Sequence, residues 1–276
     1  MSNSRGGDIR TYRIGDFEAE SRLWAPTAFT PLNECIVGLP DKTAMDVVEE
    51  SGTQVLIASA PSAFNKVDLE AFRESRIATI EALKNRLGEL GRPYVLLNNT
   101  ARSTSADQAV ERALDGSRAT GSPYVKLEVF EEVMIEGRPV LVPNNEAVEI
   151  ATANLLVAAS ELCVIPYISQ EIPLAERLIS GYGVTALRAY FGYIGQSTGP
   201  INSDEFRKFC DVVHSNYPEV TIVAEGGIGN PEHAKLALEL GADAVLVNHA
   251  ITADPTNAVN AAASFKRAVE SVTRHQ

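Results

Sequence analysis

Lys126 and Glu128 stand two residues apart in a short, mostly apolar run, residues 124–129. Successive side chains of a strand point to opposite faces, so these two share one face and the apolar residues around them share the other. A lysine held in an apolar interior is costly to keep charged, and its neutral amine can condense with a ketone or aldehyde to give an imine. Glu128 is placed to move protons beside it. The alternative is an inward ion pair that only fills space, although such pairs add little stability.

A second candidate site is the run 224–231, where three glycines lead into a predicted helix. Backbone N–H groups at a helix N-terminus attract anions, so Gly226, Gly227 and Gly229 are predicted to bind a phosphate group. The alternative is a tight turn that needs glycine only for its backbone. Glu225, at the end of the preceding strand, is predicted to face inward as a second acid or base.

Three further segments could complete the site. Asn99 follows a predicted strand and could bind a polyol, or it could cap the loop. Gly195, in the loop 190–200, could donate to the same anion, or the loop could be a plain connector. Asn248 and His249 follow the last predicted strand, next to the glycine turn. No cluster of His, Cys, Asp and Glu has metal-ligand spacing, so neither a metal nor another cofactor is predicted.

Short apolar runs alternate with amphipathic stretches along the chain. The predicted strands are Cys35–Gly38, Val55–Ala58, Tyr94–Leu97, Tyr124–Val129, Leu162–Pro166, Val184–Arg188, Val220–Ala224 and Ala244–Val247. The predicted helices are Thr43–Ser51, Leu69–Leu90, Ser105–Ala119, Asn145–Ser160, Ile172–Tyr182, Ser203–Ser215, Pro231–Leu240 and Pro255–Val272. Strands with little alternation are typical of a sheet covered on both faces.

Eight strand–helix units predict an α/β fold, a (β/α)8 TIM barrel, with its active site at the C-terminal ends of the strands. A doubly wound open sheet is the alternative, but the run 38–41 is not its glycine-rich fingerprint. Residues 12–30 are predicted to form a β-hairpin that turns at Gly15-Asp16 and plugs the N-terminal mouth. One barrel domain is expected over 12–276, after a flexible stretch at 1–11.

The composition excludes several classes of partner. The 276 residues carry 24 Lys and Arg against 36 Asp and Glu, a net charge of −12, which opposes binding to nucleic acid or to an anionic membrane surface. No apolar run reaches the roughly 18 residues of a membrane-spanning helix. The three cysteines, Cys35, Cys163 and Cys210, form no Cys-x-x-Cys motif and are expected to be reduced thiols of a cytoplasmic protein. The polar N-terminus does not have the pattern of a signal peptide.

These pieces, in this order, resemble the bacterial thiazole synthase family of thiamin biosynthesis. The matching stretches are Leu97-Asn98-Asn99-Thr100-Ala101, Val125-Lys126-Leu127-Glu128-Val129, Pro166-Tyr167-Ile168-Ser169, the turn 226–229 and residues 240–248. The resemblance implies a barrel in which Lys126 forms an imine with a phosphorylated keto sugar and Glu128 serves the acid–base steps. It also implies a protein partner: a small ubiquitin-like carrier brings sulfur as a C-terminal thiocarboxylate and docks on the barrel. A homo-oligomer is allowed by it.

The sequence also departs from the family pattern. The segments 38–40 and 59–62 lack the family's Gly-Thr-Gly and paired arginines, Glu225 replaces an aspartate, and the loop 195–199 differs from Gly-Ser-Gly-Gln-Gly. The imine lysine and the phosphate site are retained, while other substrate contacts change. We therefore expect a thiazole-synthase-like enzyme that inserts sulfur into another sugar phosphate, with a hexose 6-phosphate favoured, to give a 2-thiosugar phosphate.

Three other functions stay open. The first is thiazole synthase itself, which acts on 1-deoxyxylulose 5-phosphate. The second is a sugar-phosphate isomerase or epimerase, which would turn over substrate without a sulfur carrier. The third is a non-catalytic barrel that only holds the carrier protein, whose binding would then be unaffected by Lys126→Ala.

Overall fold

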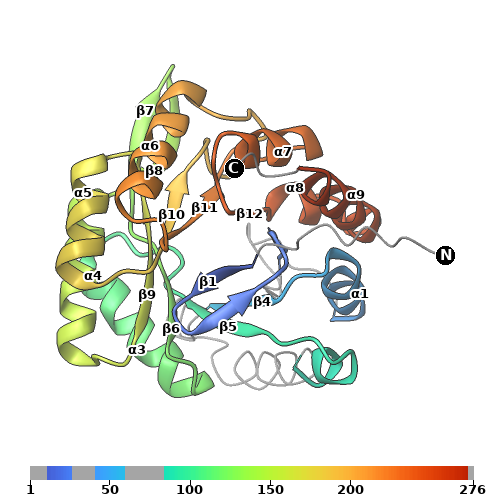
Figure 1. The fold of residues 1–276 in the computed structure, drawn as a ribbon, viewed down its shortest axis with the longest axis horizontal. Helices are drawn as coiled ribbons and strands as arrows, with labels where there is room; N and C mark the ends of the chain where they lie inside the picture. Colours follow the sequence, from blue (N-terminus) through green and yellow to red (C-terminus); the bar gives the residue numbers. More distant parts are fainter. Residues whose placement is uncertain (1–10, 27–40, 60–83, 273–276) are drawn as a thin grey trace.

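The computed structural model describes residues 11–26, 41–59 and 84–272. Eight parallel strands form one sheet in the order β3-β12-β11-β10-β9-β6-β5-β4, in which β12, the last strand along the chain, pairs with β3, the first. These strands are β3 (Leu23–Trp24), β4 (Val55–Ser59), β5 (Val95–Asn99), β6 (Tyr124–Leu127), β9 (Cys163–Ile168), β10 (Ala186–Tyr190), β11 (Thr221–Glu225) and β12 (Ala244–Leu246). The helices surround this nearly closed barrel (Figure 1), which confirms the predicted (β/α)8 fold.

Helices lie on the outside of the barrel, most of them between successive strands and two of them, α8 and α9, after the last strand. They are α1 (Asp41–Ser51), α3 (Ala106–Thr120), α4 (Asn145–Ala158), α5 (Ile172–Glu176) with the π-helical turn η3 (Arg177–Gly181), α6 (Ser203–Asn216), α7 (Pro231–Glu239), α8 (His249–Thr252) and α9 (Ala258–Glu270). Residues 84–89 are also helical, and the rest of the helix predicted at 69–90 lies outside the described residues. Side-chain oxygens of Ser105, Asn144, Asn202 and Asn230 cap four of these helices. In the described part of the chain, no helix has the length and apolarity that a membrane crossing requires.

The first strand of the barrel is not where the sequence predicted it. The strand next to β12 is β3, in which Leu23 and Trp24 pair with Val245 and Leu246. The hairpin predicted over residues 12–30 is therefore shorter than expected, because Leu23 and Trp24 belong to the barrel sheet, while residues 27–30 lie outside the described residues. A strand of two residues is too short to show a pattern of its own. The predicted strand Cys35–Gly38 lies outside the described residues.

The N-terminal hairpin is present as predicted, as β1 (Tyr12–Ile14) and β2 (Phe17–Ala19), and it turns at Gly15. It lies against the N-terminal ends of the barrel strands. The amide of Gly15 donates to Thr185, and the hydroxyl of Thr221 donates to the carbonyl of Arg13. Ile14 is fully buried and packs in the apolar cluster that fills this end of the barrel. The hairpin closes the amino-terminal mouth.

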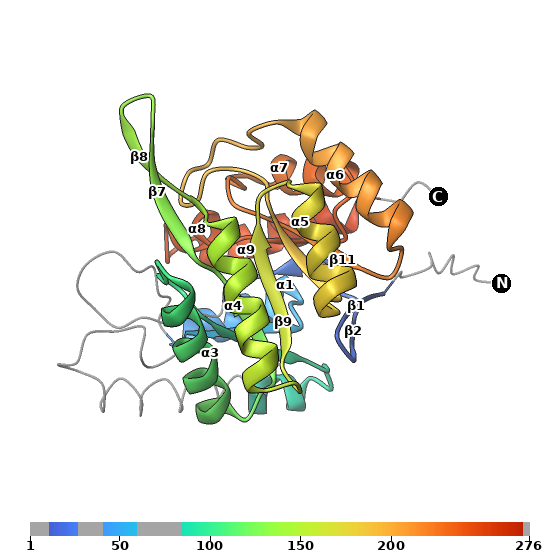
Figure 2. The ribbon, with the colours of Figure 1, turned by 90° about the vertical axis from the view of Figure 1, so that its left-hand side faces the viewer.

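A second hairpin, which the sequence analysis did not predict, follows strand β6. It consists of β7 (Phe130–Ile135) and β8 (Arg138–Pro143), which are antiparallel and meet at Glu136-Gly137. Figure 2 shows it projecting from the body on the opposite side from β1–β2. Because it leaves the C-terminal end of β6, it stands at the rim where the site of a barrel is built.

Two apolar clusters lie on the two faces of the barrel sheet. The outer cluster lies between strands and helices and includes Val125 and Leu127. The inner cluster fills the amino end of the barrel interior and includes Trp24, Leu97 and Ile165. The alternation of side chains along each strand separates the two clusters. At the carboxyl end of the barrel, the inward positions carry polar residues instead.

Candidate active site

Four charged side chains meet inside the barrel: Lys126, Glu128, Arg188 and Glu225. We call them the charged cluster. The Nζ of Lys126 lies 2.5 Å from Oε2 of Glu128 and 3.1 Å from Oε1 of Glu225. The Nη1 of Arg188 lies 3.3 Å from Oε2 of Glu128 and 2.5 Å from Oε2 of Glu225. Two cations and two carboxylates therefore share one site, and each cation contacts both carboxylates.

Strand β6 and the residue that follows it place Lys126 and Glu128 facing inward, as predicted. Lys126 and Glu128 are 4% and 6% exposed and point into the barrel, while Val125 and Leu127 pack outward under the helices. The backbone of Glu128 is fixed from the neighbouring strand, because its amide donates to the Thr100 hydroxyl and its carbonyl accepts from it. The inward geometry predicted for this pair is confirmed.

Arg188 is a member that the sequence analysis missed. It lies on β10, it is fully buried, and its Nη2 donates to the carbonyl of Leu127 at 2.5 Å. The signal was in the alternation, because the inward positions of β10 are Ala186, Arg188 and Tyr190. The predicted strand Val184–Arg188 ended at this arginine, and no role was predicted for it.

The surroundings of Lys126 differ from the expectation. The sequence predicted an apolar environment that would keep the amine neutral, but the structure places two carboxylates and a guanidinium around it. For Glu225, burial alone would raise its pKa, yet the charges of Arg188 and Lys126 and their hydrogen bonds hold that pKa below its ordinary value. Glu225 is therefore an ionised carboxylate at neutral pH.

Aromatic side chains form one wall of the site. The hydroxyl of Tyr167 on β9 donates to the backbone carbonyl of Glu225 at 3.0 Å, and its ring lies 4.8 Å from the Arg188 guanidinium carbon. Burial, followed by the negative charge of Glu225, raises the pKa of Tyr167 well above its ordinary value, so this phenol stays protonated. Phe130 and Tyr190 meet the Tyr167 ring edge to face at 6.0 and 5.9 Å.

The glycine turn begins one residue after Glu225 and packs against the loop that follows β10. Gly226 and Gly227 have φ angles of +89° and +69°. A side chain at Gly226 would overlap the carbonyl of Gly192, and a Cβ at Gly227 would lie 2.5 Å from the carbonyl oxygen of Gly199. The turn therefore needs glycine both for its conformation and for this close approach of two backbones.

Some amide groups of this turn already have partners inside the protein. The amide of Gly227 donates to the carbonyl of Tyr193 at 3.0 Å. The amide of Gly229 lies 3.3 Å from Nδ1 of His233, in the first turn of α7. His233 was not singled out from the sequence, and its ring lies beside Gly199. The amides of Gly227 and Gly229 thus serve the packing of these loops, and an anion site beside the N-terminus of α7 stays a prediction.

The other predicted residues divide into two groups. Asn99 lies beside Lys126 in the strand register, and its Oδ1 is buried without a hydrogen-bond partner among the described residues. The local bonds predicted as an alternative are made by Asn98, whose Nδ2 donates to the carbonyl of Ser122. Gly195, Asn248 and His249 are exposed. Within residues 84–272, no hydrogen bond joins Asn248 or His249 to the charged cluster.

This arrangement can support chemistry at a carbonyl. It provides a buried amine, two carboxylates within 3.1 Å of that amine, and an amide oxygen, that of Asn99, available to accept a hydrogen bond. Over the described ranges, no group of three or more His, Cys, Asp and Glu side chains could hold a metal ion. The described Cys163 and Cys210 are free thiols, and burial raises the pKa of Cys163 to about 11.

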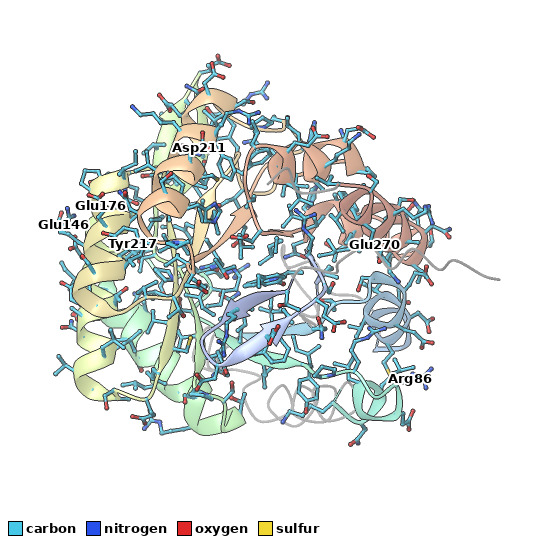
Figure 3. The ribbon with its side chains drawn as sticks, in the orientation of Figure 1. Arg86, Glu146, Glu176, Asp211, Tyr217 and Glu270 are labelled. Atoms are coloured by element: carbon cyan, nitrogen blue, oxygen red, sulfur yellow. The ribbon has the colours of Figure 1, made fainter. Side chains whose placement is uncertain are left out.

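The acidic surface contrasts with this balanced interior. Glu146, Asp211 and Glu270 lie on three different outer helices and point away from the barrel (Figure 3), and all three are exposed. The net charge of −12 over the whole chain therefore says little about the site. The charged cluster itself contains equal numbers of positive and negative groups.

Comparisons with known proteins show which family this chain resembles. The family described as "Thiazole biosynthesis protein ThiG" matches residues 40–274. The thiazole synthase of Clostridium perfringens (strain 13) is 31% identical over 258 residues, which cover 93% of this chain and 87% of the relative. The thiazole synthase of Clostridioides difficile (strain 630) is 30% identical over 257 residues, which cover 93% and 86%.

Two solved structures share the fold. The Amycolatopsis orientalis BexX/CysO complex matches with a TM-score of 0.69 at 21% identity and covers 94% of this chain and 92% of that one. Thiamine phosphate pyrophosphorylase from Pyrococcus furiosus matches with a TM-score of 0.54 at 16% identity, covering 91% and 96%. With the family match over most of its length, the chain belongs to the thiazole synthase family of sulfur-transferring synthases.

Proposed function

We propose that this protein inserts sulfur into a sugar phosphate, with a hexose 6-phosphate as the favoured substrate. The observation that carries the proposal is the buried amine of Lys126 between two carboxylates. An amine in this position can condense with a carbonyl carbon, and neighbouring carboxylates can move the protons that imine formation and carbonyl migration require.

In the proposed reaction, Lys126 bonds to C2 of the opened sugar after the carbonyl has moved there, and water leaves. The thiocarboxylate of a carrier protein then attacks C2, and loss of a proton from C1 expels the amine and leaves an enol. The enol takes a proton at C2, which returns the carbonyl to C1, and hydrolysis of the thioester at C2 consumes one water. The net change exchanges the C2 hydroxyl for a thiol and converts the thiocarboxylate to a carboxylate. No oxidant or reductant is needed.

The geometry suggests different roles for the two carboxylates. Both oxygens of Glu225 contact cations, Oε1 with Lys126 and Oε2 with Arg188. Glu128 uses Oε2 for both cations, and its Oε1 makes no hydrogen bond to any residue in the described part of the chain. We assign proton transfer to Glu128 and charge stabilisation to Glu225.

The phosphate is proposed to bind where the glycine loops meet the start of α7. The closely packed backbones at Gly192, Gly199 and Gly227 leave no space for side chains, and α7 directs its N-terminus to this place. Gly226 follows Glu225 directly, so the turn lies close enough for one sugar phosphate to reach both the turn and Lys126. Asn99 is proposed to accept a bond from a sugar hydroxyl.

A sulfur carrier protein with a C-terminal thiocarboxylate is the proposed donor. The structural neighbour BexX is in complex with a second protein, CysO, which supports a protein partner for this fold. The proposed docking side is the carboxyl end of the barrel, because a carrier tail has to reach Lys126 from there.

Thiazole synthase itself is the second candidate, because the Clostridium perfringens and Clostridioides difficile relatives carry that name at 31% and 30% identity. Its substrate would be 1-deoxyxylulose 5-phosphate. The departures of this chain from the family pattern, among them Glu225 and the loop 195–199, favour the hexose phosphate.

The test is reductive trapping. The protein is mixed with glucose 6-phosphate, fructose 6-phosphate or 1-deoxyxylulose 5-phosphate and treated with borohydride, and the adduct is located by peptide mass spectrometry. We expect a hexose phosphate adduct on Lys126 that is absent from Lys126→Ala and retained in Lys208→Ala, which changes an exposed lysine on α6. An adduct only with the pentulose would support thiazole synthase. Absence of any adduct, or turnover without a carrier, would overturn the proposal.

A further inference from the structure

Arg188 is the most completely buried ionisable side chain of the charged cluster, with no exposed surface. Its donors are directed at four acceptors. Nη1 contacts both carboxylates of the cluster, Nη2 donates to the carbonyl of Leu127 at 2.5 Å, and Nε donates to the carbonyl of Ile165 at 3.4 Å. The bonds to backbone carbonyls on β6 and β9 fix the guanidinium in one orientation, so the positions of the two carboxylates are fixed with it.

Packing alone gives no reason for an arginine here. On the adjacent strand β11, Arg188 pairs with Val223, and on β9 it lies near Ile165. Both residues are apolar and fully buried. Replacing buried ion pairs with apolar residues of similar volume is often neutral or stabilising. A buried guanidinium that contacts both acidic groups of the site therefore points to a role in the chemistry.

The charge balance of the cluster indicates that role. With Lys126 protonated, the two cations balance the two carboxylates. Once Lys126 loses its proton to become a nucleophile, two carboxylates would face each other with no counter-charge if Arg188 were absent. A guanidinium does not lose its proton in proteins, so Arg188 remains positive throughout the reaction.

We infer that Arg188 is a positioning residue that holds Glu128 and Glu225 in place and supplies their counter-charge while the Lys126 amine is neutral. This inference rests on the proposed function, in which the neutral amine attacks a carbonyl. Arg188 shares both carboxylates with Lys126, so it offsets part of the negative charge that would otherwise favour the protonated amine.

Two ionisable groups contact the Lys126 amine directly, Glu128 after β6 and Glu225 on β11. Arg188 contacts both carboxylates, Tyr167 donates to the backbone of Glu225, and Tyr190 packs on the Tyr167 ring. Burial raises the pKa of both tyrosines, which favours their neutral form. Among these groups, the permanent positive charge that opposes the two carboxylates is Arg188.

The test measures the Lys126 amine directly, without any sugar. Wild type, Arg188→Met and Arg188→Lys are treated with formaldehyde and cyanoborohydride between pH 6 and pH 10.5, and methylation of Lys126 is read by peptide mass spectrometry. We expect Arg188→Met to reach half-maximal methylation at a higher pH than wild type, with a proton concentration at least about tenfold lower. Arg188→Lys, which keeps the charge, should lie close to wild type.

A charge-balanced double variant separates this role from a merely structural one. Arg188→Met with Glu128→Gln leaves one cation and one carboxylate, so its methylation midpoint should return toward the wild-type pH. If Arg188→Met does not fold alone, Glu128→Gln alone should move the midpoint to lower pH, because a carboxylate is lost while Arg188 remains. Arg92→Gln is the control, because Arg92 donates to backbone carbonyls of Val48 and Glu49, away from the charged cluster.

Equal midpoints in wild type and folded Arg188→Met would overturn the inference, as would an Arg188→Lys profile that matches Arg188→Met. Either result is independent of the borohydride experiment. A protein that traps no sugar phosphate but shows the predicted methylation shifts would refute the proposed function and leave the role of Arg188 standing.

Discussion

The two ends of the barrel interior use the same eight strands for opposite purposes. At the amino end, inward positions carry apolar side chains such as Trp24, Val55 and Ile165, and the hairpin β1–β2 covers them. At the carboxyl end, the next inward positions on the same sheet carry the charged cluster. One step of two residues along β6 changes the interior from Tyr124 to Lys126.

The comparison shows how the fold separates stability from chemistry. The closed apolar end can supply the free energy that burial of charges at the other end consumes. The charged end has few ways to relax, because its arginine is fixed by backbone carbonyls on two strands. Substitutions at the amino end should therefore change stability alone, and those at the carboxyl end should change reactivity as well as stability.

The largest effect is expected at the carboxyl end, from Glu128→Gln. Gln cannot move protons, so sulfur insertion should slow by about 10²–10⁴-fold. The single-turnover rate of thiol formation measures this effect. Glu132→Gln, on the exposed part of β7, is the matched control and should keep the wild-type rate. A loss of less than about tenfold in Glu128→Gln would remove the assigned role of Glu128.

At the amino end, Trp24→Ala should lower the free energy of unfolding by about 3–5 kcal/mol, because it deletes a fully buried side chain. Urea unfolding measures the loss, and Leu90→Ala, at an exposed apolar residue, serves as the control. The rate of adduct formation per folded molecule should stay close to wild type. A large fall in that rate would show that the two ends are not separable.

Part of the charged carboxyl end can be predicted from the sequence. Alternation alone places Lys126 and Glu128 inside, since a strand has only two faces. It also predicts that Glu225 ends a strand next to a glycine turn. The helix positions are predicted to within a few residues, because their amphipathic runs are long and their caps are Ser or Asn.

The missed features share one physical cause: they depend on contacts between distant segments. Arg188 reads as a strand end until β11 and β6 bring the two carboxylates to it. Tyr167 contributes through a bond to the backbone of Glu225, 58 residues away. The two-residue strand β3 is defined by its pairing with β12.

The hairpin β7–β8 was missed for a local reason. Its turn is Glu136-Gly137, and the left-handed φ of +50° at Glu136 is one that a glutamate rarely adopts. The stronger sequence signals for such a turn are Asn-Gly and Asp-Gly. The charged strand Phe130–Ile135 also lacks a continuous apolar face.

A smaller effect, with a characteristic pH dependence, is expected from Glu225→Gln. The charges of Arg188 and Lys126 hold the pKa of Glu225 below its ordinary value of about 4.3, so the unfolded chain binds the proton more readily. The stabilisation from the carboxylate is fully present above that ordinary value and is lost as the pH falls through the folded-state pKa.

Glu225→Gln should therefore lower the free energy of unfolding by about 1.5–3 kcal/mol at pH 7, with the difference from wild type shrinking as the pH falls below about 4. Urea unfolding at pH 7, 5 and 3.5 measures both quantities. A difference that stays constant over this range would mean that Glu225 is not held ionised by its two cations.

The smallest effects come from a matched pair of buried tyrosines, one at each end. The Tyr12 hydroxyl donates to the carbonyl of Ser21 and accepts from the Trp24 indole, both at 2.6 Å. The Tyr167 hydroxyl donates to the carbonyl of Glu225 at 3.0 Å. Tyr12→Phe leaves a buried indole N–H without its acceptor, so it should cost about 1–3 kcal/mol, against about 0.5–1.5 kcal/mol for Tyr167→Phe.

Reactivity should reverse that order. Tyr167 holds the backbone of Glu225 and lies against the Arg188 guanidinium, so Tyr167→Phe should slow borohydride-trapped adduct formation a few-fold, while Tyr12→Phe leaves the rate per folded molecule unchanged. Measuring unfolding and trapping on the same two preparations compares both ends directly. If Tyr12→Phe slowed trapping as much as Tyr167→Phe, the apolar end would be coupled to the site, and the division of the interior into a stabilising end and a reactive end would fail.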